Sequence, residues 1–288
     1  MENITIILST YNGEKYLNEQ IDSILAQTDT NWTLLIRDDG SKDKTIELIQ
    51  YYTEKYPEKI KQIPSDENLG VIRSYEQLLK QCQTQYIMLC DQDDVWLPKK
   101  IKWTREKMTE LEKENQGKPL VVYTDLQIVD ENLNPIFSSF WNYSKIMPSL
   151  LTTFDMVCAH SAATGCTMMI NQEALQCSLP FCDEVRMHDS WILLNSLKAG
   201  GVVSYVNEPT ILYRQHTNNV IGAINEKDFY LKNKLKSLKS VLKSNLAQWK
   251  MINKLGFKSP LKYIILKFRY HIKYAKVGVY NTPQTTQY

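Results

Sequence analysis

The sequence predicts an α/β fold in which helices cover both faces of a mostly parallel central sheet. The first half of the chain alternates short apolar runs of strand length with longer amphipathic runs of helix length. Such alternation is typical of parallel strands joined by helical crossovers. With 288 residues, 43% of them hydrophobic, the chain is long enough to bury a large core around this sheet.

Five strands and four helices are expected to alternate strictly in the first 124 residues. The first helix places Leu17, Ile21 and Ile24 on one face. Pro57 closes the second helix, and Pro98 opens the fourth at its first turn. The expected strands are 4–8, 32–37, 60–63, 86–90 and 120–124, and the expected helices are 16–27, 44–56, 71–82 and 98–114.

The second half of the chain is less regular. Between residues 125 and 225 the pattern predicts a strand at 166–170 and a helix at 189–198. Beyond Asn225 it predicts two basic amphipathic helices, separated near Gly256 and Pro260.

Charge divides the chain into two parts. Residues 226–280 hold 14 lysines and arginines against two acidic residues, whereas the remainder holds 20 basic and 30 acidic residues. We therefore expect a main domain at 1–225, with halves at 1–124 and 125–225, and a basic helical extension at 226–288.

The cysteines and histidines form no disulfide framework and no zinc-finger spacing. We interpret the six cysteines as free thiols of a reducing cytoplasm. The N-terminus runs directly into a strand, so no signal peptide is expected. A membrane-spanning helix is not expected either, because no uncharged apolar run reaches about 18 residues.

The strongest chemical signal is the acidic loop, residues 91–94 (Asp-Gln-Asp-Asp), which directly follows the strand expected at 86–90. Ligands of such sheets bind beyond the carboxyl ends of the strands. Three carboxylates in four residues repel one another, and a divalent cation would supply the counter-charge. Oxygen ligands suit Mg²⁺ or Mn²⁺. The alternative is a solvated acidic turn that caps the helix opening near Pro98.

Two further polar segments follow strands of the same half. Asp38 and Asp39 follow the second strand, where a carboxylate can accept a hydrogen bond from a pyrimidine N–H and Gly40 permits a tight turn. Thr10 and Tyr11 follow the first strand, where a hydroxyl and an aromatic ring suit the binding of a nucleobase. Both segments also fit ordinary turns and helix caps.

Together these segments resemble the family-2 inverting glycosyltransferases of the GT-A fold, and the resemblance runs through most of the first 225 residues. It rests on residues 9–13, 38–45, 68–70 and 91–98. Four segments are similar to bacterial rhamnosyltransferases that build cell-wall and capsular polysaccharides. They are Asp91–Trp96, Tyr123–Leu126, Met187–Asp189 and Tyr213–His216.

The resemblance implies roles for particular residues. Asp91 and Asp93 would form the DxD pair, with Asp93 on Mn²⁺ or Mg²⁺ and Asp91 in the metal shell or on the ribose. His216 matches a position that ligates the metal or touches the diphosphate in some relatives. Asp189 stands where such enzymes place the general base, although many carry an acidic residue before it and this chain has His188. As alternatives, Asp189 is a helix cap and His216 a polar loop residue.

The other expected site residues divide by what they would contact. Those for the nucleotide sugar are Thr10, Tyr11, Asp38, Asp39, Asn68, Arg73, Asp91 and Gln92. Those that would line the acceptor cleft or support the site are Asp94, Trp96, Gly165, His188 and Arg214.

The activity implied is transfer of L-rhamnose from dTDP-β-L-rhamnose, with inversion, to a hydroxyl of a lipid-linked or growing cell-surface glycan. Asp189 would act as general base, worth about 10²–10⁴ in rate. Two alternatives are a transferase with a UDP-hexose or UDP-N-acetylhexosamine donor, and a non-catalytic scaffold that binds sugar nucleotides.

The basic extension has its own interpretation, as helices on the cytoplasmic face of the plasma membrane. A helical cap packed on the catalytic domain is the alternative. Nucleic-acid binding is not expected, because no recognised nucleic-acid module accompanies the charge.

Overall fold

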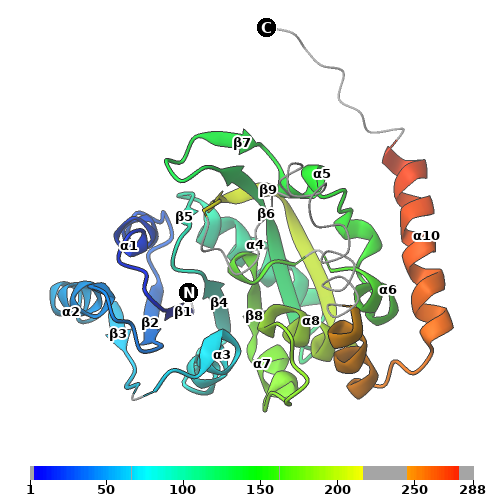
Figure 1. Ribbon diagram of the computed structural model, residues 1–288, viewed down its shortest axis with the longest axis horizontal. Coiled ribbons are helices and arrows are strands. Elements are labelled where there is room, and N and C mark those ends of the chain that lie inside the picture. Colours follow the sequence, from blue (N-terminus) through cyan, green and yellow to red (C-terminus); the bar gives the residue numbers. More distant parts are fainter. Residues whose placement is uncertain (1–2, 66, 162, 217–244, 279–288) are drawn as a thin grey trace, which may run out of the picture.

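The computed structural model describes residues 3–65, 67–161, 163–216 and 245–278, and it centres on one nine-stranded sheet (Figure 1). The strands are β1 (Ile4–Thr10), β2 (Trp32–Asp38), β3 (Ile60–Gln62), β4 (Tyr86–Cys90), β5 (Val95–Trp96), β6 (Leu120–Val129), β7 (Pro135–Phe137), β8 (Met169–Asn171) and β9 (Val202–Arg214). Their order is β3-β2-β1-β4-β8-β6-β9-β5, with β7 paired to β6.

Most strands of the sheet run in the same direction. β1, β2, β3 and β4 pair in parallel, and β9 is parallel to β6. β8 is antiparallel to both β4 and β6, so β4 and β6 run the same way. The expected mostly parallel sheet is confirmed, with β5, β7 and β8 as the reversed strands. The carboxyl ends of β1, β2, β4, β6 and β9 therefore point to one edge of the sheet.

Helices cover both faces. They are α1 (Leu17–Leu25), α2 (Thr45–Lys55), α3 (Gly70–Lys80), α4 (Lys100–Glu114), α5 (Phe140–Tyr143), α6 (Phe154–Ala159), α7 (Gln172–Ser178), α8 (His188–Lys198) and α10 (Pro260–Gly278), with 3-10 turns η1 (Pro148–Leu150) and η2 (Gly165–Thr167).

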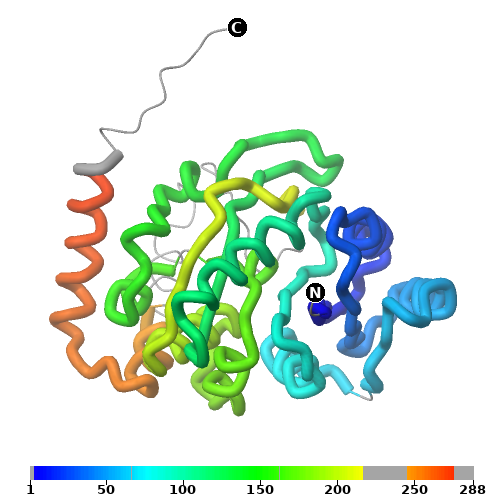
Figure 2. The backbone as a smooth tube through the Cα atoms, turned by 180° about the vertical axis from the view of Figure 1, so that it is seen from behind, coloured from blue at the N-terminus to red at the C-terminus, as the bar shows by residue number. Residues whose placement is uncertain are grey.

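Side chains of β1 alternate between two apolar clusters, as the pleat of a strand requires. Ile6 and Leu8 pack with α1, α2 and α4 on one face. Ile7 packs with α3, α6, α7 and α8 on the other. Figure 2 shows α4 lying across the sheet from behind, whereas α3 and α8 lie on the near side in Figure 1. This two-sided burial explains why the strands have continuous apolar sequences.

The nine elements expected in the first 124 residues all form, and eight lie within two residues of their predicted limits. β6 runs on to Val129, and the short strand β5 between β4 and α4 interrupts the expected strict alternation. The strand expected at 166–170 begins later, because the Gly165–Thr167 segment turns into η2 and only Met169–Asn171 pairs with β4. β9 was not predicted. Its middle residues Asn207 and Glu208 are exposed, so neither strand alternation nor a continuous apolar run is visible there.

The C-terminal part is attached to the main body. A helix at 245–254 precedes α10, which runs beside α6 at the end of the molecule far from β3 (Figure 1). Tyr270 of α10 stacks on His160 with ring centroids 4.2 Å apart, and its hydroxyl donates to Lys145 O at 3.1 Å. Of the first of the two expected basic helices, residues 245–254 are helical, and the part before residue 245 lies outside the described residues. Within the described part, no helix has the length and apolar character needed to cross a membrane.

Candidate active site

A cavity of about 1150 Å³ opens at the edge where the parallel strands end. Loops after β1, β2, β4 and β9 line it together with the start of α8. Of the predicted site residues, the structure places in its wall Thr10, Tyr11, Asp39, Asn68, Asp91, Gln92, Asp93, Gly165, His188, Asp189 and His216. The predicted residues outside the wall are Asp38, Arg73, Asp94, Trp96 and Arg214.

The acidic loop places two carboxylates in the cavity wall. Tyr75 donates its hydroxyl to Asp91 Oδ1 at 3.0 Å. Burial and the neighbouring charge of Asp93 raise the pKa of Asp91 to about 7. Asp93 Oδ2 lies 2.8 Å from His216 Nε2. The loop therefore carries repulsion that a bound cation would relieve.

These carboxylates do not cap the following helix. The residue before α4 is Lys99, and no side chain caps the helix end. Asp94 instead turns into the interior and is fully buried. The alternative of a solvated, helix-capping turn is therefore wrong for this loop.

Arg214, at the end of β9, holds the acidic loop in place. Its backbone N–H donates to Asp94 Oδ1 at 3.2 Å, and its Nε donates to the backbone oxygen of Asp93 at 2.9 Å. The same guanidinium forms an ion pair with Glu19 of α1 and donates to Glu131 O at 2.5 Å. Arg214 thus connects four segments of the chain at the edge of the cavity.

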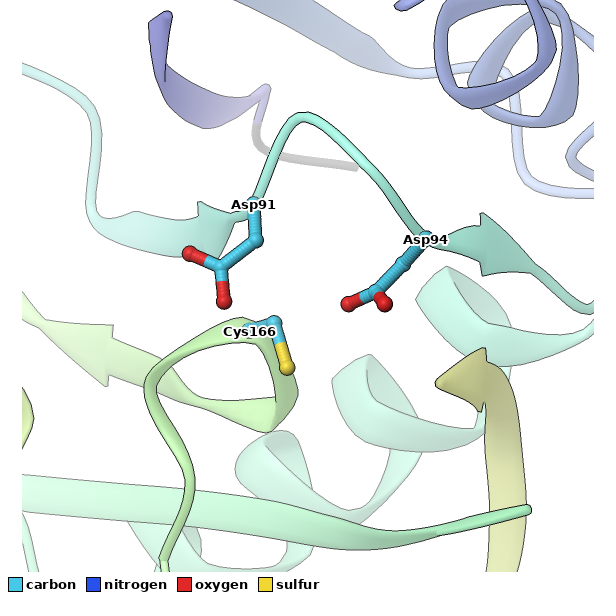
Figure 3. A group of neighbouring side chains, drawn as sticks. All are labelled: Asp91, Asp94 and Cys166. Carbon is cyan, nitrogen blue, oxygen red and sulfur yellow. The ribbon is translucent and has the colours of Figure 1, made fainter. Parts of the chain in front are cut away.

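Two sets of side chains in this region have ligand atoms for a metal. Asp91, Asp94 and Cys166 converge from both ends of the loop and from η2, with one ligand atom of each within 4.8 Å of the others (Figure 3). Burial, however, raises the pKa of the Cys166 thiol well above its usual range, which disfavours the thiolate form that binds a metal. Mg²⁺ and Mn²⁺ prefer oxygen ligands, and neither Asp94 nor Cys166 lines the cavity.

The second set is Asp91, Asp93 and His216, and all three side chains line the cavity. It offers two carboxylates and one imidazole beside open space for phosphate oxygens and water. The direct contact of His216 with Asp93 shows that their ligand atoms already converge. This set suits a divalent cation that must also contact a ligand in the cavity.

The two carboxylates after β2 have different surroundings. Asp38 accepts hydrogen bonds from Thr10 Oγ1 at 2.9 Å and from the backbone N–H of Gly40 and Ser41, so it shapes the turn. Asp39 lines the cavity and also accepts from Gly70 N at 2.8 Å.

Of two other residues predicted to bind the nucleotide, one lines the cavity and one does not. Asn68 lines the cavity, and its side-chain amide donates to Asp39 O at 2.7 Å. Arg73 instead pairs with Glu76 within α3 and ties this helix to a neighbouring loop through Asp183, each at 2.7 Å. Arg73 is therefore occupied away from the cavity.

Tyr11 presents a half-exposed ring at the cavity mouth. Gln92 fixes the backbone of Tyr11, accepting from its N–H at 2.9 Å and donating to its carbonyl at 3.1 Å. A Cβ at Gly13 would lie 2.5 Å from Gln92 Oε1, so glycine permits this contact. The loops after β1 and β4 are thereby joined.

Asp189 faces the cavity from the first turn of α8. The helix begins after Met187, so Asp189 is not its N-cap residue. Its Oδ2 accepts the backbone N–H of Gly165 at 3.0 Å, and its Oδ1 accepts that of Ser190 at 2.5 Å. The carboxylate is 8% exposed and held at two points, with the same cavity in front of it as the acidic loop.

Several residues of the wall were not predicted. They come from loops, from the start of α5 and from the helix at 245–254, and they include Lys15, Glu131, Phe140, Ile146, Arg186 and Gln248. Arg186 has one usable signal, since it directly precedes Met187-His188-Asp189. Gln248 shows that the extension contributes to the cavity, which local sequence does not indicate.

The family described as "Glycosyl transferase family 2" matches residues 5–177. The dTDP-rhamnosyl transferase RfbG of Shigella flexneri is 28% identical over 228 residues, which cover 75% of this chain and 74% of RfbG.

Two solved structures show the same fold. The mannosyltransferase PcManGT from Pyrobaculum calidifontis, in complex with GDP-Man and Mn²⁺, aligns with a TM-score of 0.59 at 13% identity, over 98% of this chain and 88% of that chain. S. aureus TarS 1-349 in complex with UDP-GlcNAc aligns with a TM-score of 0.56 at 18% identity, over 79% and 63%. This chain thus spans less than two thirds of the TarS fragment.

The family match covers more than half of the chain and includes the acidic loop and the loops after β1 and β2. The likeness to the solved structures confirms the predicted GT-A fold. The chain therefore belongs to glycosyl transferase family 2.

Proposed function

We propose that the protein is an inverting, metal-dependent glycosyltransferase that transfers L-rhamnose from dTDP-β-L-rhamnose to a hydroxyl of a lipid-linked or growing cell-surface glycan. The observation that carries this proposal is the position of Asp189 across one cavity from the acidic loop. The two are close enough for the charge of Asp189 to contribute to the raised pKa of Asp91. The shared cavity supports the proposal that Asp189 is a general base beside the site of the leaving diphosphate.

Asp189 would remove the proton of the acceptor hydroxyl. The acceptor oxygen then forms its bond to the anomeric carbon while the bond from that carbon to the diphosphate breaks on the opposite side. The proton moves to a carboxylate oxygen of Asp189, and dTDP leaves. The hydrogen bonds from Gly165 and Ser190 keep the carboxylate oriented, which favours a positioned base over a mobile one.

Asp91, Asp93 and His216 would hold Mn²⁺ or Mg²⁺, which supplies charge neutralisation for the departing diphosphate. Tyr11 and Asp39 would contact the nucleoside, since both line the cavity at the loops after β1 and β2. The similarity to RfbG, a dTDP-rhamnosyl transferase, supports the choice of donor. PcManGT and TarS were solved with GDP-Man and UDP-GlcNAc, so other donors must be tested directly.

The outer face of α10 supports the further proposal that the protein binds to the cytoplasmic surface of the plasma membrane. Its large apolar residues recur every three or four positions, and each is at least half exposed. They are Leu261, Ile264, Ile265, Phe268 and Ile272. On the opposite face, Leu266 and Tyr270 are buried against the body. The helix has no acidic residue, and Arg269 and Lys273 are exposed, so the face suits an anionic lipid bilayer.

The first test is donor turnover. The purified protein is incubated with dTDP-rhamnose, UDP-glucose, UDP-galactose, UDP-GlcNAc or GDP-mannose, with Mn²⁺ or Mg²⁺ and a lipid-linked acceptor mimic. We expect turnover of dTDP-rhamnose that EDTA abolishes. Turnover of a UDP-sugar instead would support the glycosyltransferase activity but would show that rhamnose is not the transferred sugar. Failure to bind any nucleotide would favour the non-catalytic scaffold.

Asp189→Asn should lower the transfer rate by about 10²–10⁴ while dTDP-rhamnose binds as before, because the amide keeps the shape but accepts no proton. Transfer rate and donor affinity are measured in parallel. Asp183→Asn, at a side chain that is 98% exposed, is the matched control. A loss of donor affinity as large as the loss of rate would contradict the role of base.

Asp93→Ala should abolish the dependence of dTDP affinity on Mn²⁺, because it removes one proposed ligand and the contact that aligns this ligand with His216. Affinity is measured by calorimetry with Mn²⁺ and with EDTA. His216→Ala should also reduce the dependence of dTDP affinity on Mn²⁺. If Mn²⁺ strengthens dTDP binding to Asp93→Ala as much as to the wild type, the ligand assignment is wrong.

Replacing both Ile265 and Phe268 with serine should weaken binding to vesicles that contain phosphatidylglycerol by at least about tenfold, because each loses apolar area that the bilayer would bury. Co-sedimentation measures the bound fraction. Ile46→Ser, at an exposed isoleucine of α2, is the control. Two results would argue against a membrane-binding role of this face: equal binding of the double serine variant and Ile46→Ser, or wild-type binding to neutral vesicles as strong as to those with phosphatidylglycerol.

A further inference from the structure

The ring of His188 is buried, but neither of its nitrogens has a hydrogen-bond partner among the described residues. The residue is 3% exposed and lines the cavity. Buried polar atoms are nearly always paired, since an unpaired one loses its hydration without compensation. A partner that is absent from the protein itself is therefore expected in the cavity.

The surroundings hold this ring in one orientation. It lies flat on Tyr75, with ring centroids 3.8 Å apart and planes 16° apart. The hydroxyl of Tyr75 is itself engaged with Cys90 O at 2.7 Å and Asp91 Oδ1 at 3.0 Å. A Cβ at Gly165 would lie 2.8 Å from His188 Nε2. Glycine at this position therefore avoids a clash with the imidazole ring.

The position of the ring indicates what it meets. Through Tyr75 it adjoins Asp91, on the side proposed for the diphosphate, and in the chain it directly precedes Asp189, the proposed base. The transferred sugar must lie between these two groups, because its anomeric carbon joins the diphosphate and receives the acceptor oxygen. On the proposed function, His188 thus lies nearer to the site of the sugar than to Tyr11 and Asp39, the proposed contacts of the nucleoside.

We infer that His188 forms a hydrogen bond with a hydroxyl group of the transferred sugar and so helps to determine which sugar is accepted. This inference rests on the proposed function. Burial lowers the pKa of His188, which favours the neutral ring with one donor and one acceptor nitrogen. A sugar hydroxyl also donates and accepts, so either tautomer can pair with it.

The test compares a nucleotide sugar with its nucleotide. The difference in affinity between dTDP-rhamnose and dTDP, measured by calorimetry with Mn²⁺, gives the contribution of the sugar. H188F retains an aromatic ring on Tyr75 and removes both nitrogens, so dTDP-rhamnose should bind about 10–100-fold more weakly while dTDP is unaffected. H160F is the matched control, since His160 also stacks on a tyrosine and has an unpaired nitrogen outside the cavity.

A second variant guards against a misfolded H188F. H188N is smaller, keeps one donor and one acceptor, and should restore part of the sugar's contribution. The melting temperature of unliganded H188F should equal or exceed that of the wild type, because unpaired buried nitrogens are replaced by carbon.

Three results would overturn the inference: an equal loss of dTDP and dTDP-rhamnose affinity, an unchanged difference between them, or an equal effect of H160F. If the wild type uses a UDP-sugar, that sugar and UDP replace the dTDP pair, and only the rhamnose assignment fails. A wild type that binds no nucleotide would overturn the proposed function, and this inference with it.

Discussion

The active-site edge depends on one buried cation, the guanidinium of Arg214, which is 2% exposed. Burying a guanidinium is costly unless its N–H groups are paired. Arg214 meets this condition with the carbonyls of Asp93 and Glu131 and the carboxylate of Glu19, and its guanidinium lies 4.4 Å from the ring centroid of Tyr16. Because these partners belong to separate segments, a single side chain sets the position of the acidic loop.

The same region buries two ionisable side chains that form no ion pair in the part of the chain that the structure describes. Lys100 is fully buried over the ring of Trp96, and its Nζ has no hydrogen-bond partner among the described residues. Burial lowers its pKa to about 8, and burial likewise raises the pKa of Asp94 well above its usual range. A fold optimised only for stability would place apolar residues there. Such local conflicts are typical of sites shaped by ligand binding.

The sequence predicts the first half of the site well because that half is local in origin. Strands β1, β2 and β4 are parallel and end at one edge, so polar residues that follow them must meet there. Local sequence does not decide which of two adjacent carboxylates lines the cavity. Asp39 does so, whereas Asp38 accepts hydrogen bonds within its own turn. The contact of Arg73 with Asp183 is likewise invisible to local sequence, since the two residues are 110 positions apart.

The second half of the site depends on pairings that are distant in sequence. β9 joins β6 over about eighty residues, with Thr124 opposite Val206. It also pairs with β5, with Val95 opposite Leu212, and this second pairing brings His216 to Asp93. The family match ends at residue 177, before Arg186, His188 and Asp189. On the proposed function, most residues assigned to the nucleotide and the metal lie within the matched segment, with His216 as the exception, whereas the proposed base Asp189 and His188 lie beyond it. A relative with a different sugar would then differ most directly in the segments beyond residue 177, while the loops after β1, β2 and β4 keep their role.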